Sequence, residues 1–204
     1  SAASSVTEAV GDLGEASVEW KLDGIRIQVH RRAGEVRLWT RNLNEVTTRM
    51  PEVVAQVAAL PGGDLVADGE VLVVDDVGRP VAFQDTASRV SADAARVAVV
   101  RPFLFDLLHL EGTDLVDQPL SARRAALAAL AGDLVVPGVV TVDAGAGEVV
   151  LADALAAGHE GVVVKGADSR YEAGRRGKAW RKVKPVHTFD LVVLAAEWGH
   201  GRRT

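Results

Sequence analysis

The chain has 204 residues, of which 48% are hydrophobic and 25% charged, and it contains no cysteine. This composition is typical of a folded globular protein, and the lack of cysteine excludes disulfides and cysteine-ligated metal centres. No apolar run approaches the ~20 residues of a membrane-spanning helix and no export signal opens the sequence, so we expect a cytoplasmic protein without membrane contact.

Apolar periodicity and turn residues predict a series of strands with interleaved helices. Strands are expected at residues 17–21, 24–31, 35–40, 65–74, 98–109, 135–143, 161–165, 179–184 and 190–198. Helices are expected at residues 6–13, 51–60, 83–90, 122–131 and 148–157, with Ser121 as the N-cap of the fourth. Because hairpin-sized links outnumber strand–helix–strand units, the expected fold class is α+β with largely antiparallel sheets.

Cations gather in two segments, although the formal net charge of the chain is −5. Residues 165–184 hold eight of the 23 Lys and Arg against two acids, and residues 21–41 hold six against two. Residues 42–160 carry 18 acids and seven cations. If the two basic segments meet in the fold, they form a positive groove in a negative protein; the alternative is two separate solvated faces.

The stretch EWKLDGIR at residues 19–26 contains a lysine in an unusual setting. Alternating apolar and charged residues predict that a strand ends at Lys21, just before a tight turn at the following Asp and Gly. A lysine at such a position has an anchored stem and an amine that is able to face a pocket. A nucleophilic lysine must be neutral, which burial, a metal ion or nearby cations such as Arg26 favour. The alternative is a surface lysine paired with Glu19 or Asp23.

Acids also lie inside two strongly apolar predicted strands. Glu70 follows Asp68 and a glycine within residues 65–74, where a buried carboxylate is costly unless it is paired or liganded. Phe105 precedes Asp106 in the next predicted strand, and its ring is placed to lie against a flat base. Stacking of a base on an aromatic ring contributes roughly 1–3 kcal/mol. The alternatives are an edge-strand carboxylate and an ordinary core aromatic residue.

Charged residues flank the last predicted strands of the basic C-terminal segment. Glu160 and Lys165 stand at opposite ends of an apolar run. Lys182 and Lys184 share one face of the next strand, about 7 Å apart, a spacing that suits a polyphosphate. No P-loop signature and no H-E-x-x-H metal motif is present, and the five histidines are scattered.

In order along the chain, these features resemble the signatures of the covalent nucleotidyltransferases, the polynucleotide ligases and messenger-RNA capping enzymes. The matching segments are ExKxDGxR at 19–26, an arginine at Arg41, DGE at 68–70, an aromatic–acid pair at 105–106, EGxxxK at 160–165 and WxKxK at 180–184. The acid two positions before the lysine resembles ligases more than capping enzymes. Nearly the whole chain is similar to the adenylation domain of a bacterial ATP-dependent DNA ligase, which implies antiparallel sheets flanked by helices around a nucleotide groove.

The resemblance implies a role for each matching residue. Lys21 would attack the α-phosphate of ATP and become lysyl-AMP. Glu19 would accept a hydrogen bond from the adenine amino group, and Phe105 would stack on the adenine. Glu70 would bind a ribose hydroxyl or a metal ion, and Glu160 would help to hold Mg²⁺. Arg26 is expected to contact the ribose or a phosphate. Contacts to phosphate are also expected from Arg41, Lys165, Lys182 and Lys184.

In the full-length enzyme that this resemblance implies, AMP would pass to the 5′-phosphate at a nick, and the 3′-hydroxyl would then displace it. The expected partners are ATP and nicked duplex DNA, the expected state is a monomer, and the expected processes are DNA replication, repair and recombination. Two alternatives remain open. One is an RNA ligase or capping-type nucleotidyltransferase, and the other is a nucleotide- or DNA-binding module without turnover.

We expect two segments of unequal size. Residues 1–188 would form the adenylation domain, and residues 189–204 would begin an oligonucleotide-binding (OB-fold) domain. The chain starts without methionine, and we expect it to be a piece of a longer protein. It should fold alone and bind ATP, yet react slowly, because the family's basic residues that orient pyrophosphate would lie beyond Thr204.

Overall fold

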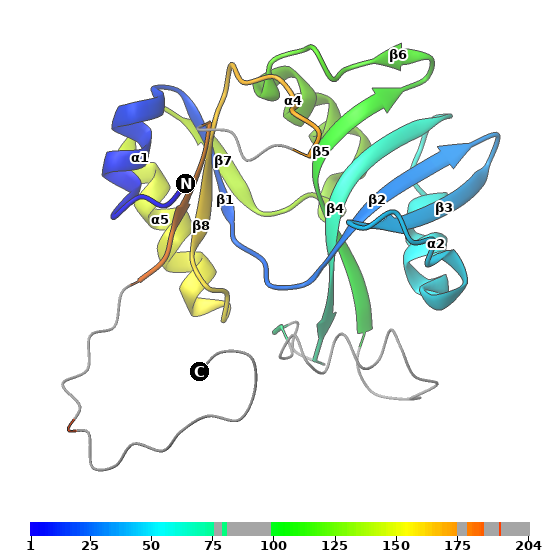
Figure 1. The fold of residues 1–204 in the computed structure, drawn as a ribbon, viewed down its shortest axis with the longest axis horizontal. Helices are drawn as coiled ribbons and strands as arrows, with labels where there is room; N and C mark the ends of the chain where they lie inside the picture. Colours follow the sequence, from blue (N-terminus) through cyan, green and yellow to red (C-terminus); the bar gives the residue numbers. More distant parts are fainter. Residues whose placement is uncertain (76–78, 81–98, 175–178, 186–191, 193–204) are drawn as a thin grey trace, which may run out of the picture.

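The computed structural model of the chain describes residues 1–75, 79–80, 99–174, 179–185 and 192, in which two antiparallel sheets face each other (Figure 1). The first sheet has the strand order β7-β1-β8-β9. Its strands are β1 (Ala16–Trp20), β7 (Gly138–Thr141), β8 (Val162–Gly166) and β9 (Trp180–Val183). The second sheet has the order β3-β2-β4-β5-β6. Its strands are β2 (Ile25–Arg32), β3 (Glu35–Thr40), β4 (Leu65–Val74), β5 (Val99–Leu110) and β6 (Thr113–Asp114).

Helices cover the outer faces of the sheets and bury their apolar residues (Figure 1). Helices α1 (Val6–Leu13) and α5 (Ala144–Ala156) pack on the first sheet, and α2 (Pro51–Ala58) and α4 (Leu120–Ala131) pack on the second. Short 3-10 turns, η1 (Thr47–Arg49) and η2 (Gly132–Leu134), precede α2 and follow α4. A third, smaller apolar cluster that includes Leu22, Leu72, Phe103 and Val136 joins the inner faces of the two sheets. No helix within the described ranges has the length and apolar character to cross a membrane.

The link between β1 and β2 carries the chain from one sheet to the other. The two strands are not paired, so residues 21–24 form a crossover and not the tight turn that was expected. A Cβ atom at Gly24 would lie 2.4 Å from the carbonyl oxygen of Val71, so only glycine lets the crossover run this close to β4. This crossover places Lys21 between the two sheets.

The α+β class with antiparallel sheets is confirmed, and most predicted elements lie within one or two residues of their positions. Two helix starts were wrong. Helix α5 begins at Ala144 because the Asp143 side chain caps it by accepting from the amide of Gly145. Helix α4 begins at Leu120 with Pro119 at the N-cap position, so Ser121 lies inside the first turn and is not the cap.

The expected strand at 135–143 was also too long, because its first residues bridge the two sheets. The amide of Val136 donates to the carbonyl of Leu104 in β5, and the carbonyl of Pro137 accepts from Trp20 in β1. The helix expected at 83–90, the strand at 190–198 and the domain start at 189–204 lie essentially outside the described residues.

Candidate active site

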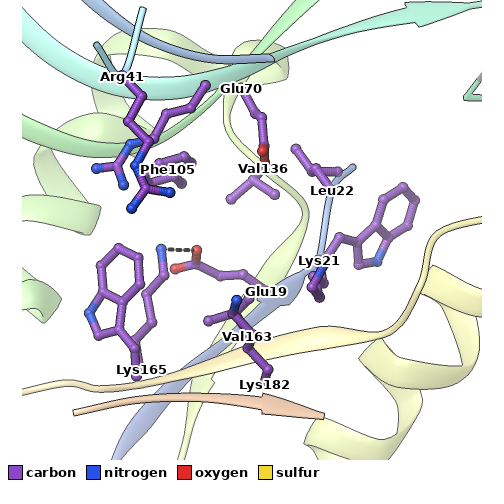
Figure 2. Close-up of a pocket in the computed structure, with 13 residues that line it drawn as sticks. Glu19, Lys21, Leu22, Arg41, Glu70, Phe105, Val136, Val163, Lys165 and Lys182 are labelled. Atoms are coloured by element: carbon purple, nitrogen blue, oxygen red, sulfur yellow. Dashed lines mark hydrogen bonds and ion pairs between the residues drawn. The ribbon is translucent and has the colours of Figure 1, made fainter. Parts of the chain in front are cut away.

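A cavity of about 230 Å³ lies between the inner faces of the two sheets. Figure 2 shows Arg41, Glu70 and Phe105 on one side of it and Glu19, Val163 and Lys165 on the other. We call it the intersheet cavity. Its lining residues are Glu19, Trp20, Lys21, Leu22, Arg26, Arg41, Glu70, Phe105, Val136, Val163, Lys165, Trp180 and Lys182. The fold thus brings residues of both basic segments to one cavity, as the groove hypothesis predicted.

Lys21 stands at the edge of the intersheet cavity, one residue beyond β1. Its amide donates to the carbonyl of Gly161 at 2.8 Å, which fixes its backbone against the start of β8. The side chain is 14% exposed, and its Nζ atom forms an ion pair with Glu160 Oε2. The lysine is therefore anchored at its backbone and held by one carboxylate at its tip.

Glu160 is shared between two lysines. Lys184 Nζ lies 2.7 Å from the same Oε2 atom that binds Lys21. Burial raises the pKa of the Glu160 carboxyl, but hydrogen bonds from Lys184 and Lys21 outweigh burial and leave the pKa below its ordinary value. Glu160 is therefore a carboxylate at neutral pH, and the two ammonium groups lie close together around it.

Glu19 and Lys165 form a second, more deeply buried ion pair. Glu19 is 2% exposed and Lys165 is 3% exposed, and Lys165 Nζ donates to Glu19 Oε2. The other carboxylate oxygen, Oε1, accepts from the Ser17 hydroxyl at 2.7 Å. Arg124 Nη1 lies 3.0 Å from Oε1 as a second ion-pair partner. A buried carboxylate with this many partners is fixed in position.

Two aromatic rings enclose the ammonium of Lys165. Lys165 Nζ lies 4.5 Å from the centroid of Phe105 and 4.3 Å from that of Trp180. The two rings meet edge to face at 6.2 Å. The guanidinium carbon of Arg26 also lies 5.6 Å from the Phe105 centroid. Phe105 thus forms a wall of the intersheet cavity and has cations around it. This arrangement favours binding of a ligand that carries both an aromatic ring and negative charge.

Glu70 reaches the intersheet cavity from β4. It forms no direct ion pair within the described part of the chain, although Lys21 and Arg26 act on it from a distance. Burial raises the pKa of Glu70 to about 7, against the opposing effect of these two cations. Near neutral pH this carboxyl is therefore about half ionised, and a cation or a hydroxyl donor in the cavity would stabilise its charged form.

Arg26 is held by Asp68, a residue to which no site role had been assigned. Arg26 Nη2 lies 2.7 Å from Asp68 Oδ2, and the Tyr171 hydroxyl donates to the same oxygen at 2.6 Å. Gln28 Nε2 donates to Asp68 Oδ1 at 3.3 Å. Tyr171 lies in the loop after β8, so its contact with Asp68 ties the first sheet to the second. Asp68 within DGE was a visible signal, but its partner on a distant loop was not.

Buried arginines of α4 are the other feature that sequence reasoning missed. Arg123 is 1% exposed and clamps Asp106 with two hydrogen bonds, Nε to Oδ1 at 2.7 Å and Nη2 to Oδ2 at 3.1 Å. Asp106 is therefore a structural residue, and its bonds to Arg123 fix β5 to α4 next to Phe105. Two adjacent arginines in a helix otherwise made of Ala, Leu and one Ser were the available signal, because the helix offers no acid to pair with them.

The remaining predicted residues lie at the rim. Arg41 is exposed just beyond β3 and lines the intersheet cavity from the second sheet. Lys182 is exposed on β9 and lines it from the first. Lys184 follows β9 and reaches Glu160. Of the ten predicted residues, eight line the cavity, and Glu160 and Lys184 join it through Lys21.

The described residues contain no group of three or more His, Asp or Glu side chains able to form a metal site alone. Glu70 and Glu160 are separate carboxylates, the first on β4 of the second sheet and the second just before β8 of the first sheet. Such a donor set suits a hard cation that keeps waters and takes its other ligands from phosphate oxygens.

The comparisons with known proteins agree with this geometry. Residues 1–184 match the family described as "ATP dependent DNA ligase domain". A probable DNA ligase of Pseudarthrobacter chlorophenolicus is 56% identical over 200 residues, which cover 98% of this chain and 39% of that protein. One from Streptomyces coelicolor is 56% identical over 216 residues, covering 99% and 41%. The chain therefore spans about 40% of the length of these relatives.

Solved structures give the same answer. The ligase domain of LigD from M. tuberculosis has a TM-score of 0.70 and 30% identity, with 90% of this chain and 58% of that chain covered. Mycobacterial DNA ligase D complexed with ATP and MES has a TM-score of 0.66 and 31% identity, covering 83% and 54%. The match of the whole intersheet architecture confirms what the ordered motifs implied, and the chain belongs to the family of ATP-dependent DNA ligase domains.

Proposed function

We propose that this chain binds ATP in the intersheet cavity and transfers AMP to Lys21 Nζ. The observation that carries this proposal is the position of Lys21, which is anchored at the crossover between the sheets and opens onto a cavity lined by an aromatic ring and several cations. The Nζ atom attacks the α-phosphorus, an N–P bond forms, and the bond to the pyrophosphate oxygen breaks. In-line displacement of this kind depends mainly on positioning and charge stabilisation.

The nucleophile must lose a proton before it attacks. Lys21 Nζ contacts Glu160, which is ionised and is therefore the side chain placed to accept that proton. Glu160 is 37% exposed, so it passes the proton on to solvent, and Lys184, which contacts the same oxygen, then remains as the ion-pair partner of the carboxylate. In this scheme Glu160 holds Lys21 in place before reaction, and Lys184 keeps Glu160 paired afterwards.

The base and the ribose fit the inner part of the cavity. Phe105 from β5 and Val163 from β8 line it from opposite sheets, and the flat purine is proposed to lie between them. Glu19 is proposed to accept a hydrogen bond from the adenine amino group. Glu70 and Arg26 are proposed to contact the ribose. The complex of mycobacterial DNA ligase D with ATP supports ATP as the nucleotide.

Phosphates are proposed to lie toward the cationic rim. Lys182, Lys184 and Arg41 come from both sheets and neutralise negative charge that develops on the leaving pyrophosphate. Lys165, which is buried beside Glu19, is proposed to contact a phosphate from the inner part of the cavity. Glu70 and Glu160 would hold Mg²⁺, which adds further charge neutralisation at the phosphates when it is bound.

The relatives are DNA ligases more than twice the length of this chain, so sealing of nicked duplex DNA is proposed for the whole protein. The adenylation domain is proposed to occupy residues 1–188, and the family match ends at residue 184. A cytoplasmic monomer that acts in DNA replication, repair and recombination is the accompanying proposal, and the probable DNA ligases among the relatives support its link to DNA.

Incubation with ATP labelled at the α-phosphate and Mg²⁺, followed by a denaturing gel, tests the first step directly. We expect a covalent label that peptide mapping assigns to Lys21, and no label from ATP labelled at the γ-phosphate. GTP in place of ATP separates this reading from a capping-type enzyme. A label on another lysine, or none from ATP, would contradict the proposal.

A further inference from the structure

Arg124 of α4 touches two residues of the intersheet cavity without lining the cavity itself. Its side chain is 9% exposed. Nη1 lies 3.0 Å from Glu19 Oε1, and Nη2 donates to the carbonyl oxygen of Val136 at 3.0 Å. Glu19 lies on β1 and Val136 in the segment that bridges the two sheets. One buried guanidinium therefore fixes the distance between a carboxylate of the cavity and the backbone beside it.

The partners of Glu19 show which acceptor position of its carboxylate remains free beside Arg124. A carboxylate has about four acceptor positions. Oε1 receives the Ser17 hydroxyl and faces Arg124, whereas Oε2 receives only Lys165. Of the two acceptor positions on Oε2, one has no partner among the described residues, whereas Oε1 is held by the Ser17 hydrogen bond and by an ion pair with Arg124, whose Nη1 forms no hydrogen bond. Arg124 and Ser17 both act on Oε1, so they decide which way the remaining position of Oε2 points.

The other buried arginines have different tasks. Arg123 binds Asp106 and the carbonyls of Gln118 and Ser169. Arg31 donates to five carbonyl oxygens at the end of α2 and just beyond it, and none of these residues lines the intersheet cavity. Arg124 is thus the buried arginine, among the described residues, whose side chain bonds to cavity-lining residues and to no other element.

We propose that Arg124 is a positioning residue that sets base selectivity, because it aims the free acceptor of Glu19 and holds the Val136 backbone at a fixed distance from it. This inference rests on the proposed adenylation function and on Glu19 as the residue that reads the exocyclic amino group. Arg124 itself touches no nucleotide. Its loss leaves Glu19 free to turn toward Lys165 and leaves the Val136 carbonyl without its donor, so the acceptor no longer faces the base.

The test compares ATP with purine riboside triphosphate, an analogue that lacks the 6-amino group. Equilibrium binding to the 204-residue chain is followed through the fluorescence of Trp20 and Trp180, which line the cavity. Wild type should prefer ATP by about tenfold or more, as expected for a hydrogen bond to a charged group. Arg124→Met should bring the two affinities to within about threefold, mainly by weakening ATP.

Two further variants keep the result interpretable. Arg124→Lys retains a cation near Glu19 but is too short to hold Val136 as well, so it should lose part of the preference. Arg31→Lys is the matched control, because it also replaces a buried arginine; it should lower the melting temperature and leave the preference intact. The rate of Lys21 labelling at saturating ATP should fall less in Arg124→Met than the affinity for ATP does.

Retention of the full preference for ATP in folded Arg124→Met would overturn the inference, and if that variant does not fold, full retention in Arg124→Lys would overturn it equally. A wild-type chain that labels Lys21 but does not distinguish the two nucleotides would also overturn it, while the adenylation proposal would stand. A wild-type chain that binds no nucleotide and takes no label would contradict the adenylation proposal itself.

Discussion

The two sides of the intersheet cavity treat their carboxylates differently. On the first sheet, Glu19 is paired with Lys165 and Arg124, and Glu160 with Lys21 and Lys184. On the second sheet, Glu70 has no direct ion pair within the described residues, and burial raises its pKa to about 7.

This difference separates a preorganised side from a side that depends on ligand. Charges that are already paired need little rearrangement when a substrate arrives, and they hold the nucleophile in a defined place. A carboxyl that is only half ionised gains most from a partner supplied by the ligand. We therefore expect the first sheet to position the chemistry and the second to respond to nucleotide and pH.

The largest expected effect tests the first sheet. Lys21→Ala should abolish formation of the lysyl-adenylate, because Lys21 is the lysine of the crossover at residues 21–24, whereas Lys184 reaches Glu160 from beyond β9. Lys21→Arg is the sharper variant, since it retains a cation for Glu160 and lacks a nucleophile of the required kind. Both should bind ATP and take no label on a denaturing gel, with circular dichroism as the control for folding. A stable label in either variant would show that the nucleophile lies elsewhere.

Loss of the aromatic wall should come next. Phe105→Ala should weaken ATP binding by roughly 1–3 kcal/mol, the range for a base stacked on a ring. Phe105→Leu keeps most of the apolar volume but has no π-face, and Phe105→Trp keeps one. Calorimetric titration should therefore rank the affinities as Phe and Trp above Leu, and Leu above Ala. Equal affinities for all four would make Phe105 an ordinary core residue.

Glu70, the carboxyl of the second sheet that has no direct ion pair within the described residues, should make ATP affinity depend on pH. Its ionised form is the one that accepts a ribose hydroxyl or binds a cation, so ATP affinity should rise as pH increases through about 7. The change between pH 6 and pH 8 should be about tenfold. Glu70→Gln should flatten this dependence. An unchanged pH profile in the Gln variant would assign the titration to another group.

The raised pKa of Glu70 also makes the stability of the fold depend on pH, in the direction opposite to that of the ATP affinity. The folded-state pKa of Glu70 lies above the ordinary value of 4.5, so the protonated form favours the folded state. The stabilisation from this group is complete below about pH 4.5 and is lost as pH rises through about 7. At pH 8, Glu70→Gln should therefore be more stable than wild type in urea denaturation, provided that the ligand is absent.

The smallest expected effect concerns the hydrogen bond from Tyr171 to Asp68, which links the two sheets. Tyr171→Phe removes only the hydroxyl that donates to Asp68 Oδ2 at 2.6 Å. The loss should be about 0.5–1.5 kcal/mol of unfolding free energy, the usual net value of one hydrogen bond. Ser169→Ala is a control in the same loop, because among the described residues the Ser169 hydroxyl bonds only to the local carbonyl of Gly166. A weakened ATP affinity in Tyr171→Phe alone would show that the tie also positions Arg26.

Much of the site was predictable from spacing, and the reasons are local. Lys21 follows a strand that the alternation of residues predicts, and Phe105 and Lys182 face the cavity because strand residues alternate between faces. What spacing could not show is which partner each charge finds. Tyr171 and Asp68 are 103 positions apart, and Arg124 and Glu19 are 105 apart, so no local pattern links either pair.

The sequence by itself determined most of the described elements, the family and eight of the thirteen residues that line the cavity, because each of these depends on short-range periodicity and on motifs in order. Only the tertiary structure decided that β1 and β2 belong to different sheets and that Lys21 lies on the crossover between them. It also decided which carboxylates are paired. Pairing depends on burial and on distances between strands remote in sequence, and these exist only once the two sheets face each other.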